Sequence, residues 1–241
     1  MTPEIKAQLA PHGTLRAGIN MSNFLLVTGR SPAGDPEGVS PSMARAIADR
    51  LGVPIQYVPF PKPGELADVA GNDVWDIGLI GAEPARAEKI AFTAAYAEIE
   101  ATYLVPAGSP LKAIADVDRP GVRIAVTARS AYDLWLERNI KQATLVRSNS
   151  LDSALDQFLS DKLDALAGLR PRLLSDVAKL PGAVILPGQF TAVQQAVGTT
   201  KANAAAAAWL RAFVEEAKAS GLVAQLIAQH KVNGLSVAPP G

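Results

Sequence analysis

Side chains that usually carry nucleophilic or metal-assisted chemistry are scarce in this sequence. It contains no cysteine, which excludes disulfides, thiolate catalysis and cysteine-ligated zinc or iron–sulfur sites. Only two histidines are present, His12 and His230, far apart in the two terminal segments. A Ser-His-Asp triad and a histidine metal site are therefore not expected, and we interpret both histidines as solvated surface residues. The sequence predicts no cofactor, no metal and no catalytic residue.

Two residues have the chemistry of anion recognition instead. The guanidinium of Arg86 is a planar fork that keeps its charge and can donate two parallel hydrogen bonds to a carboxylate. On spacing alone, however, the better interpretation of Arg86 is a surface arginine paired with Glu83 or another exposed carboxylate. Ser130 stands at a predicted helix start, where free N–H groups and positive potential favour an anion. The alternative is that Ser130 only caps the helix, and one serine can fill both roles.

Composition narrows the class of protein. The chain of 241 residues is 49% hydrophobic, which suits two lobes with their own cores. Lys plus Arg and Asp plus Glu are both 23, and no basic cluster is visible, so nucleic acid is not an expected partner. No apolar run approaches the ~20 residues of a membrane span. The N-terminus lacks a signal-peptide pattern, which indicates a cytoplasmic protein if Met1 is the native start, or else a signal that was removed.

Strand-like and helix-like apolar patterns alternate along nearly the whole chain. This alternation is typical of α/β architecture with largely parallel sheets. We expect Ser40 and Pro41 to open a helix that Gly52 ends, and Ser130 to cap another helix with Asp133 three residues on. The C-terminal tail from Val237 is expected to fray. The predicted strands are 15–19, 55–58, 76–80, 122–126 and 165–169, and the last two helices follow residue 203.

Several fragments, in this order and spacing, resemble the periplasmic solute-binding proteins that serve polar amino-acid ABC transporters, which form family 3 of the bacterial extracellular solute-binding proteins. The likeness runs over about residues 13–226. The segment from Glu83 to Tyr96 resembles the Thr-Pro-Glu-Arg motif of the family, which is followed six residues later by Phe-Ser and then by Pro-Tyr. The other fragments are Gly13–Asn20, Gly38–Val53, Trp75–Gly78 and Asp116–Val126.

The resemblance implies a two-lobed fold of the type II periplasmic-binding-protein class, with two crossover strands forming the hinge. Lobe 1 would comprise residues 1–99 plus 194–241, and lobe 2 residues 100–193. The crossings are expected near Ala97–Tyr103 and Phe190–Val197, and hinge closure over the ligand follows from this architecture. The resemblance also implies a periplasmic monomer that delivers a solute to an ABC transporter permease.

Site residues carry over by position. Arg86 matches the arginine that clamps the α-carboxylate of the ligand, and Ser130 matches a hydroxyl at a helix start in the second lobe. The family's Gly-Thr-Thr or Gly-Ser-Thr reads Ala128-Arg129-Ser130 here, so Arg129 either adds positive charge or points to solvent.

The expected contacts in the first lobe are less regular. Asn20 stands where the family often has Asp, and Asn23 and Phe24 lie in a loop that often carries an aromatic over the ligand; for Phe24 the alternative is core packing. Gly81 and Ala82 could offer backbone N–H groups. The chain is two residues shorter there than common amino-acid binders, and their serines have no counterparts.

Leu169 is the most informative departure. In the family this strand ends in an aspartate that pairs with the ligand's α-ammonium, and leucine cannot neutralise that charge. Arg170 next to it would repel the ammonium further if it faced inward. We therefore predict a small carboxylate ligand without an α-ammonium, unless Glu98 or Glu100 supplies the missing acid.

Gln194 and Gln195 lie at the return crossing, where they could bond either the ligand or strand edges. Three functions follow. The first is a carboxylate-binding protein that is not an enzyme. The second is a cytoplasmic ligand sensor of the same fold. The third is an enzyme like cyclohexadienyl dehydratase, which would need a placed acid or base, with Glu83 as the obvious carboxylate.

Overall fold

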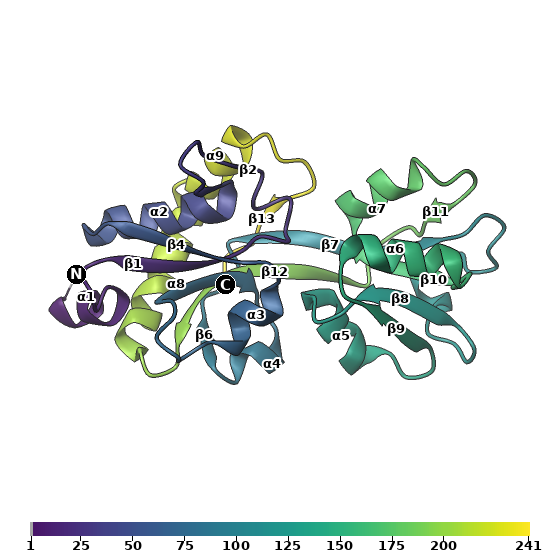
Figure 1. The fold of residues 1–241 in the computed structure, drawn as a ribbon, viewed down its shortest axis with the longest axis horizontal. Coiled ribbons are helices and arrows are strands. Elements are labelled where there is room, and N and C mark those ends of the chain that lie inside the picture. Colours follow the sequence, from purple (N-terminus) through teal and green to yellow (C-terminus); the bar gives the residue numbers. More distant parts are fainter. Residues whose placement is uncertain (1) are drawn as a thin grey trace. The chain divides into compact units, whose positions relative to one another are not determined.

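The computed structural model describes residues 2–241, which divide into two compact units by the packing of their Cα atoms. Unit 1 comprises the chain up to Glu98 together with Gln194–Gly241, and unit 2 comprises Ile99–Val193. The chain leaves unit 1 within strand β7 (Ala97–Val105) and returns within strand β12 (Thr191–Thr200). Figure 1 labels both strands.

Unit 1 is built around three parallel strands in the order β4-β1-β5, with β12 antiparallel to β5. The alternation of strands and helices thus gives the parallel pairing that the sequence predicts. The helices α2 and α8 both pack against α9, and α3 packs on β1 and β5 (Figure 1). The elements are α1 (Pro3–Leu9), β1 (Leu15–Asn20), β2 (Gly29–Arg30), β3 (Pro36–Glu37), α2 (Val39–Leu51), β4 (Ile55–Phe60), α3 (Pro63–Asp68), β5 (Ile77–Gly81), α4 (Pro84–Ala87), β6 (Ile90–Phe92), α8 (Ala204–Ala219), α9 (Leu222–Gln229) and β13 (Ser236–Val237).

Unit 2 repeats the scheme on a smaller scale, with parallel strands in the order β10-β8-β9. Its helix α6 packs on β8, β9 and β10, and apolar side chains of α6 and β10 meet in one core. Strand β10 is buried at every position, as its continuous apolar run predicts. The elements are β8 (Arg123–Thr127), α5 (Ala131–Asn139), β9 (Thr144–Ser148), α6 (Leu151–Ser160), β10 (Ala165–Leu169), α7 (Arg170–Val177), β11 (Val184–Ile185) and one 3-10 turn (Ile114–Asp116).

Helix α2 begins earlier than predicted. Its N-cap is Gly38, and Ser40 lies inside the first turn, where its N–H donates to the carbonyl of Leu26 at 3.1 Å. Gly38 has φ 144°, and a Cβ there would lie 2.2 Å from the oxygen of Leu26. Only glycine allows this close approach, so the helix starts where the loop touches it. Its end is as predicted, because Gly52 is the left-handed C-cap at φ 65°.

The strands β7 and β12 also take part in the pairing of the main sheet. Hydrogen bonding runs continuously from β5 through β12 and β7 to β10, so the main strands form one connected set. Strand β7, with 9 residues, pairs with β10 of unit 2 and with β13 of unit 1, whereas β12, with 10 residues, pairs with β5 and β6 of unit 1.

The C-terminal tail is ordered, so the prediction of fraying is wrong. Strand β13 pairs antiparallel with β7, placing Val237 opposite Ala97. The N–H of Ala238 donates to the carbonyl of Tyr96 at 3.1 Å, and Ala238 is only 5% exposed. Backbone pairing and burial offset the entropy that a frayed tail would keep.

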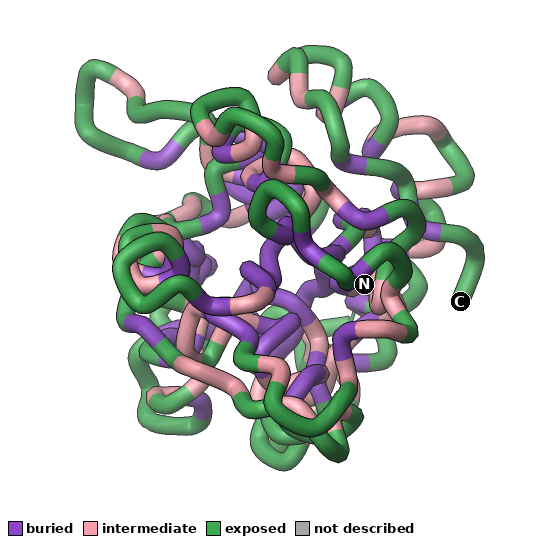
Figure 2. The backbone as a smooth tube through the Cα atoms, turned by 90° about the vertical axis from the view of Figure 1, so that its right-hand side faces the viewer, coloured by how far each residue is buried: buried purple, intermediate pink, exposed green. Residues whose placement is uncertain are grey.

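Burial follows the strands, with exposed backbone mostly in the outer loops (Figure 2). The prediction for the histidines holds for His12, which is exposed, but His230 is half-buried and its Nε2 lies 2.9 Å from the hydroxyl of Ser42. Within residues 2–241, every helix is too short or too polar to cross a membrane.

Candidate functional site

In unit 1, the carboxyl ends of β1 and β5 meet at one edge of the sheet. The two strands are parallel with Ile19 opposite Leu79, so Asn20 and Gly81 end up at this edge. Ligands of open α/β folds bind outside the carboxyl ends of such strands. The short helix α4, which begins one residue after Glu83, follows directly from β5 and carries Arg86.

Arg86 is buried. Its residue is 6% exposed, and its Nη1 donates a hydrogen bond to the carbonyl oxygen of Gly81 at 2.8 Å. This burial contradicts the interpretation of Arg86 as a surface arginine. Glu83 is also buried, at 9% exposed. A guanidinium held at low exposure beside a strand end suits the binding of a carboxylate, because low polarity strengthens a charge-assisted bond.

The loop after β1 is held by its own asparagines. The Oδ1 atom of Asn20 accepts from the N–H and hydroxyl of Ser22, at 3.1 and 2.7 Å. The Oδ1 atom of Asn23 accepts from the N–H groups of Leu25 and Leu26, at 3.2 and 3.3 Å. Both side chains are buried, and their acceptor oxygens are used to form turns. Each asparagine therefore acts first as a scaffold of this loop.

Phe24 stands out on that loop. It is 38% exposed, which contradicts the alternative that it packs in the core. The turns formed by Asn20 and Asn23 fix the backbone on its N-terminal side. A large ring that is held in place but exposed offers apolar contact area at low entropy cost.

The backbone N–H groups expected of Gly81 and Ala82 are partly occupied. The N–H of Ala82 donates to the carbonyl of Gln194 at 2.7 Å, so it is not available to a ligand while this bond holds. The side chain of Gln194 likewise donates through Nε2 to Glu98 at 2.9 Å. The return strand β12 pairs with β5 here, and contact of these groups with a ligand stays a prediction. Gln195 is 3% exposed and lies opposite Gly81 in the ladder.

In unit 2, Ser130 is the N-cap of α5. Its hydroxyl accepts from the N–H of Asp133 at 3.1 Å and donates to the carbonyl of Thr127 at 2.8 Å. Arg129 is exposed and has φ 60°, an uncommon backbone conformation for a residue other than glycine. Its N–H donates to Asp133 at 2.7 Å, and Asp133 also binds Nε of Arg147 at 2.9 Å. From the sequence, Asp133 was predicted only as a partner of the helix cap. The hydrogen bond that its carboxylate accepts from the N–H of Arg129 was not predicted.

Leu169 ends β10 and is 8% exposed. The parallel pairing of β10 with β8 puts Leu169 and Ser130 at the same edge of the unit 2 sheet. Arg170, the next residue, donates through Nε to Glu100 and through Nη2 to the carbonyl of Gly188. Glu100, one of the two acids considered as substitutes for the missing aspartate, is therefore paired with Arg170. The positive charge of Arg170 is in turn offset by Glu100.

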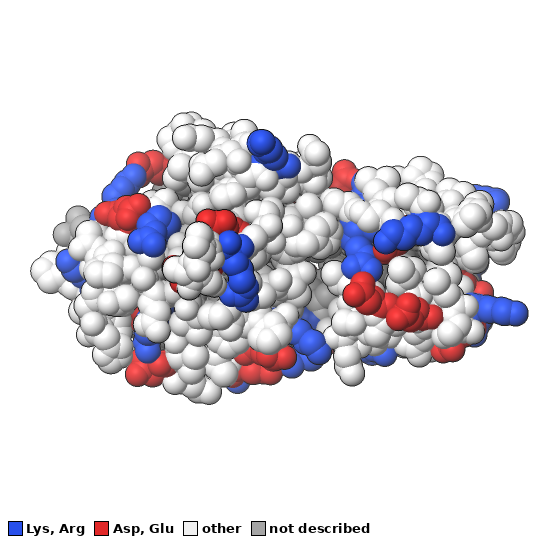
Figure 3. Space-filling view, turned by 45° about the horizontal axis from the view of Figure 1, so that its top comes forward, with Lys and Arg blue, Asp and Glu red and all other residues white. Residues whose placement is uncertain are grey.

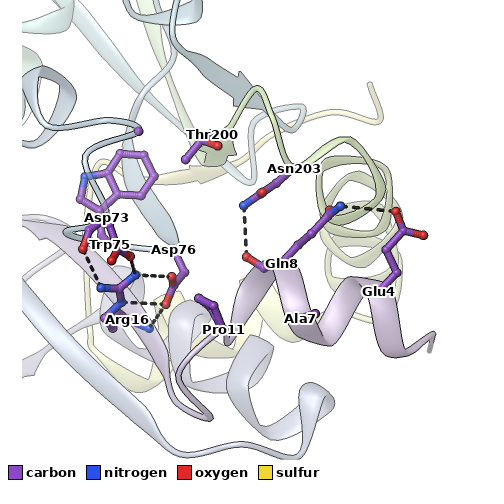
Figure 4. Close-up of a pocket in the computed structure, with 11 residues that line it drawn as sticks. Glu4, Ala7, Gln8, Pro11, Arg16, Asp73, Trp75, Asp76, Thr200 and Asn203 are labelled. Atoms are coloured by element: carbon purple, nitrogen blue, oxygen red, sulfur yellow. Dashed lines mark hydrogen bonds and ion pairs between the residues drawn. The ribbon is translucent and has the colours of Figure 1, made fainter.

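A hollow of about 370 Å³ on unit 1 lies elsewhere, beside the N-terminal helix (Figure 4). Its charged groups bond to each other: Arg16 donates to Asp76 at 2.7 and 3.2 Å and to Asp73 at 2.5 Å. These bonds raise the pKa of Arg16 and lower that of Asp73. Its amides are also used, since Asn203 donates to the carbonyl of Gln8 at 3.1 Å. This hollow is a structural junction that attaches α1.

The charges on the face shown in Figure 3 give no further candidate. Acidic and basic side chains are interspersed on the face shown in Figure 3, and much of that face is uncharged. In the part of the chain that the structure describes, no group of three or more His, Asp and Glu residues could hold a metal ion.

The model of the bacterial extracellular solute-binding proteins, family 3, matches residues 16–232. The chain belongs to this family. No curated protein sequence matches this family 3 chain.

Solved structures share the fold of this family 3 protein at low identity. A putative binding component of an ABC transporter from Wolinella succinogenes, complexed with lysine, is 20% identical with a TM-score of 0.74, covering 90% of this chain and 95% of its own. An ancestral amino acid-binding protein, a precursor of cyclohexadienyl dehydratase, is 20% identical with a TM-score of 0.73, covering 92% and 96%. A histidine kinase sensor domain is 18% identical with a TM-score of 0.76, covering 94% and 99%. These likenesses establish the fold of the chain.

Proposed function

We propose that this family 3 protein binds a small carboxylate that lacks an α-ammonium group. Arg86 receives the carboxylate, and Phe24 covers the apolar part of the ligand. On unit 2, the N-terminus of α5 offers positive potential to a second oxygen of the ligand, and Ser130 donates to that oxygen once its hydroxyl turns away from the carbonyl of Thr127. Closure over the ligand is proposed from the hinge motion of this fold class.

The observation that carries this ligand class is the apolar end of β10. Leu169 is buried there with no carboxylate of its own, and the neighbouring cation, Arg170, is held by Glu100. Glu98 accepts a hydrogen bond from Gln194. An α-ammonium in this environment would lose its hydration without gaining a dedicated partner, which costs several kcal/mol. A carboxylate without that group avoids the cost.

The wider role follows from the family. Members are extracellular solute-binding proteins, and we propose that this chain delivers its ligand to an ABC transporter permease from the periplasm.

A thermal-shift screen tests the proposal. Keto, hydroxy and aromatic acids, dicarboxylates and standard amino acids are each added to the protein. A ligand at one hundred times its dissociation constant stabilises the folded state by about 2.7 kcal/mol, which is readily measured. We expect shifts from acids without an amino group, and no shift in Arg86→Ala with the same compounds. A screen in which only standard amino acids stabilise the protein would contradict the proposal.

A further inference from the structure

Three aromatic rings form a row within unit 2. The ring centroids of Tyr103 and Phe190 lie 4.6 Å apart, and those of Phe190 and Trp135 lie 5.4 Å apart, with the ring planes tilted by 34° and 35°. Tyr103 lies on β7, Phe190 stands one residue before β12, and Trp135 lies on α5. Because these separations are in the range of favourable ring pairs, each ring holds the next one in place.

The row lies on the same face of the unit 2 sheet as Leu169. Tyr103 and Ala101 are two residues apart on β7, so their side chains point to one face. Ala101 lies opposite Leu169 of β10, and residues directly opposite each other in an antiparallel pair share a face. The N–H of Phe190 donates to the carbonyl of Ala101 at 3.0 Å, which brings the second ring to this strand end.

Trp135 approaches the same edge of the sheet from helix α5. It stands five residues after Ser130, the N-cap of this helix. Side chains of a helix lean toward its N-terminus, so the indole extends from the second turn back toward the cap. Because Ser130 and Leu169 lie at one edge of the sheet, the aromatic row ends beside the unit 2 groups that the proposed function assigns to the ligand.

The exposure of the two outer rings sets them apart from the core. Tyr103 is 2% exposed, whereas Phe190 and Trp135 are only half-buried. On the other face of the sheet, Phe158 of α6 packs in one core with Leu104 and is 2% exposed. A fixed pair of rings that stays partly in water has apolar area left to cover, and a further flat ring covers it with the offset or tilted contacts that aromatic pairs prefer.

We propose that Phe190 and Trp135 bind an aromatic ring of the ligand, so that the solute of this family 3 protein is an aryl carboxylic acid. The inference rests on the proposed function, because it adds a ring to the carboxylate that Arg86 receives. A saturated ring of the same carbon number is puckered and keeps the apolar contact, but it loses the contact between aromatic rings. That contact is worth a factor of roughly two to ten in affinity.

Phenylacetate and cyclohexylacetate test the inference, because both lack an α-ammonium and differ only in the aromatic character of the ring. Calorimetry measures both acids with the parent, Trp135→Leu, Phe190→Leu and Trp209→Leu. The last variant is the matched control, since Trp209 is a half-buried indole on α8 of unit 1 whose ring lies 5.6 Å from that of Phe213. We expect the parent and the control to bind phenylacetate roughly fivefold more tightly than cyclohexylacetate, and both unit 2 variants to reduce this preference below about twofold.

Tryptophan emission gives an independent readout of the same site. Trp135 is the single tryptophan of unit 2, whereas Trp75 and Trp209 belong to unit 1. Saturating phenylacetate should change the emission of the parent and of Trp209→Leu, because the ligand ring contacts the indole of Trp135. The emission of Trp135→Leu should stay unchanged.

Equal affinity of the parent for the two acids would overturn the inference and leave the carboxylate proposal standing. A preference retained in both unit 2 variants would overturn it as well, and so would binding of neither acid by a parent that still binds keto or hydroxy acids. A parent that binds no acid at all would contradict the proposed function and, with it, this inference. The comparison of the two acids in the parent needs no substitution, so it decides the question even if Trp135→Leu does not fold.

Discussion

The carbonyl oxygen of Gly81 accepts a hydrogen bond from Nη1 of Arg86, 2.8 Å away, so the last residue of β5 fixes the arginine that follows it on α4. One donor of the guanidinium fork is thereby used to orient the group. The charge stays in a position that is 6% exposed, at the edge of the sheet. The guanidinium of Arg86 therefore has a fixed orientation as well as a fixed charge.

Substitution of Arg86 should therefore weaken carboxylate binding even when the charge is kept. We expect both Arg86→Ala and Arg86→Lys to cost about 2–5 kcal/mol of binding free energy, because lysine cannot donate to Gly81 and to a carboxylate in the same fork geometry. Calorimetry with any stabilising acid from the screen measures the effect. Unchanged affinity in both variants would remove Arg86 from the site.

Phe24→Ala should weaken ligand binding without lowering the stability of the fold. Because the ring is 38% exposed, its removal should change the free energy of unfolding by no more than about 0.5 kcal/mol, while ligand affinity falls. The control is Phe213→Ala, a ring on α8 that is 5% exposed, which should cost about 3–5 kcal/mol of stability. If Phe24→Ala melts like the control and binds like the parent, the ring is part of the core after all.

Ser130 and Ser150 offer a matched pair in unit 2. Each is a helix N-cap whose hydroxyl accepts from the third N–H of its helix at 3.1 Å. Replacement of either by alanine should reduce stability by about 1 kcal/mol. Only Ser130→Ala should also weaken ligand binding, because Ser130 lies at the strand edge shared with Leu169. Equal ligand affinities in the two variants would show that Ser130 is a cap alone.

The Arg16–Asp73 bond predicts how acid affects stability. The hydrogen bond from Arg16, together with its charge, lowers the pKa of Asp73 below the usual value in an unfolded chain, about 4. A lowered folded pKa gives stability that is present above the unfolded pKa and is lost as the pH falls through the folded value. Urea unfolding at stepwise lower pH should therefore show the parent converging on Asp73→Asn below about pH 4. A stability difference that is constant with pH would contradict this. Asparagine also tolerates the positive φ of 55° at this position.

Much of the fold was open to prediction because its signals are local. The apolar run of β10 and the glycine after α2 each specify their element within a few residues, and both predictions are confirmed. The start of α2 and the C-terminal tail were predicted wrongly for the opposite reason. Gly38 is fixed by contact with Leu26, and the tail by pairing with β7, and neither partner is visible in local sequence.

The candidate site divides in the same way. Residue type and resemblance pointed to Arg86 and Ser130, and the structure places each at the carboxyl edge of a sheet. The partners of Gln194, Ala82 and Glu100 could not be read from the sequence, because each bond joins segments far apart in the chain. For Phe24, whose apolar ring fits a core and a ligand surface equally well by type alone, the exposure excludes core packing, and contact with a ligand stays a prediction.

The central claim is the ligand class, and calorimetry on matched pairs tests it most directly. Each pair consists of a keto or hydroxy acid and its parent amino acid of equal size, titrated into the parent protein and into Leu169→Asp. The account predicts that the parent binds the acid without the amino group at least about tenfold more tightly, a difference of about 1.4 kcal/mol, and that Leu169→Asp narrows or reverses this preference. Sub-micromolar binding of a standard amino acid by the parent, with no binding of its deaminated partner, would contradict it.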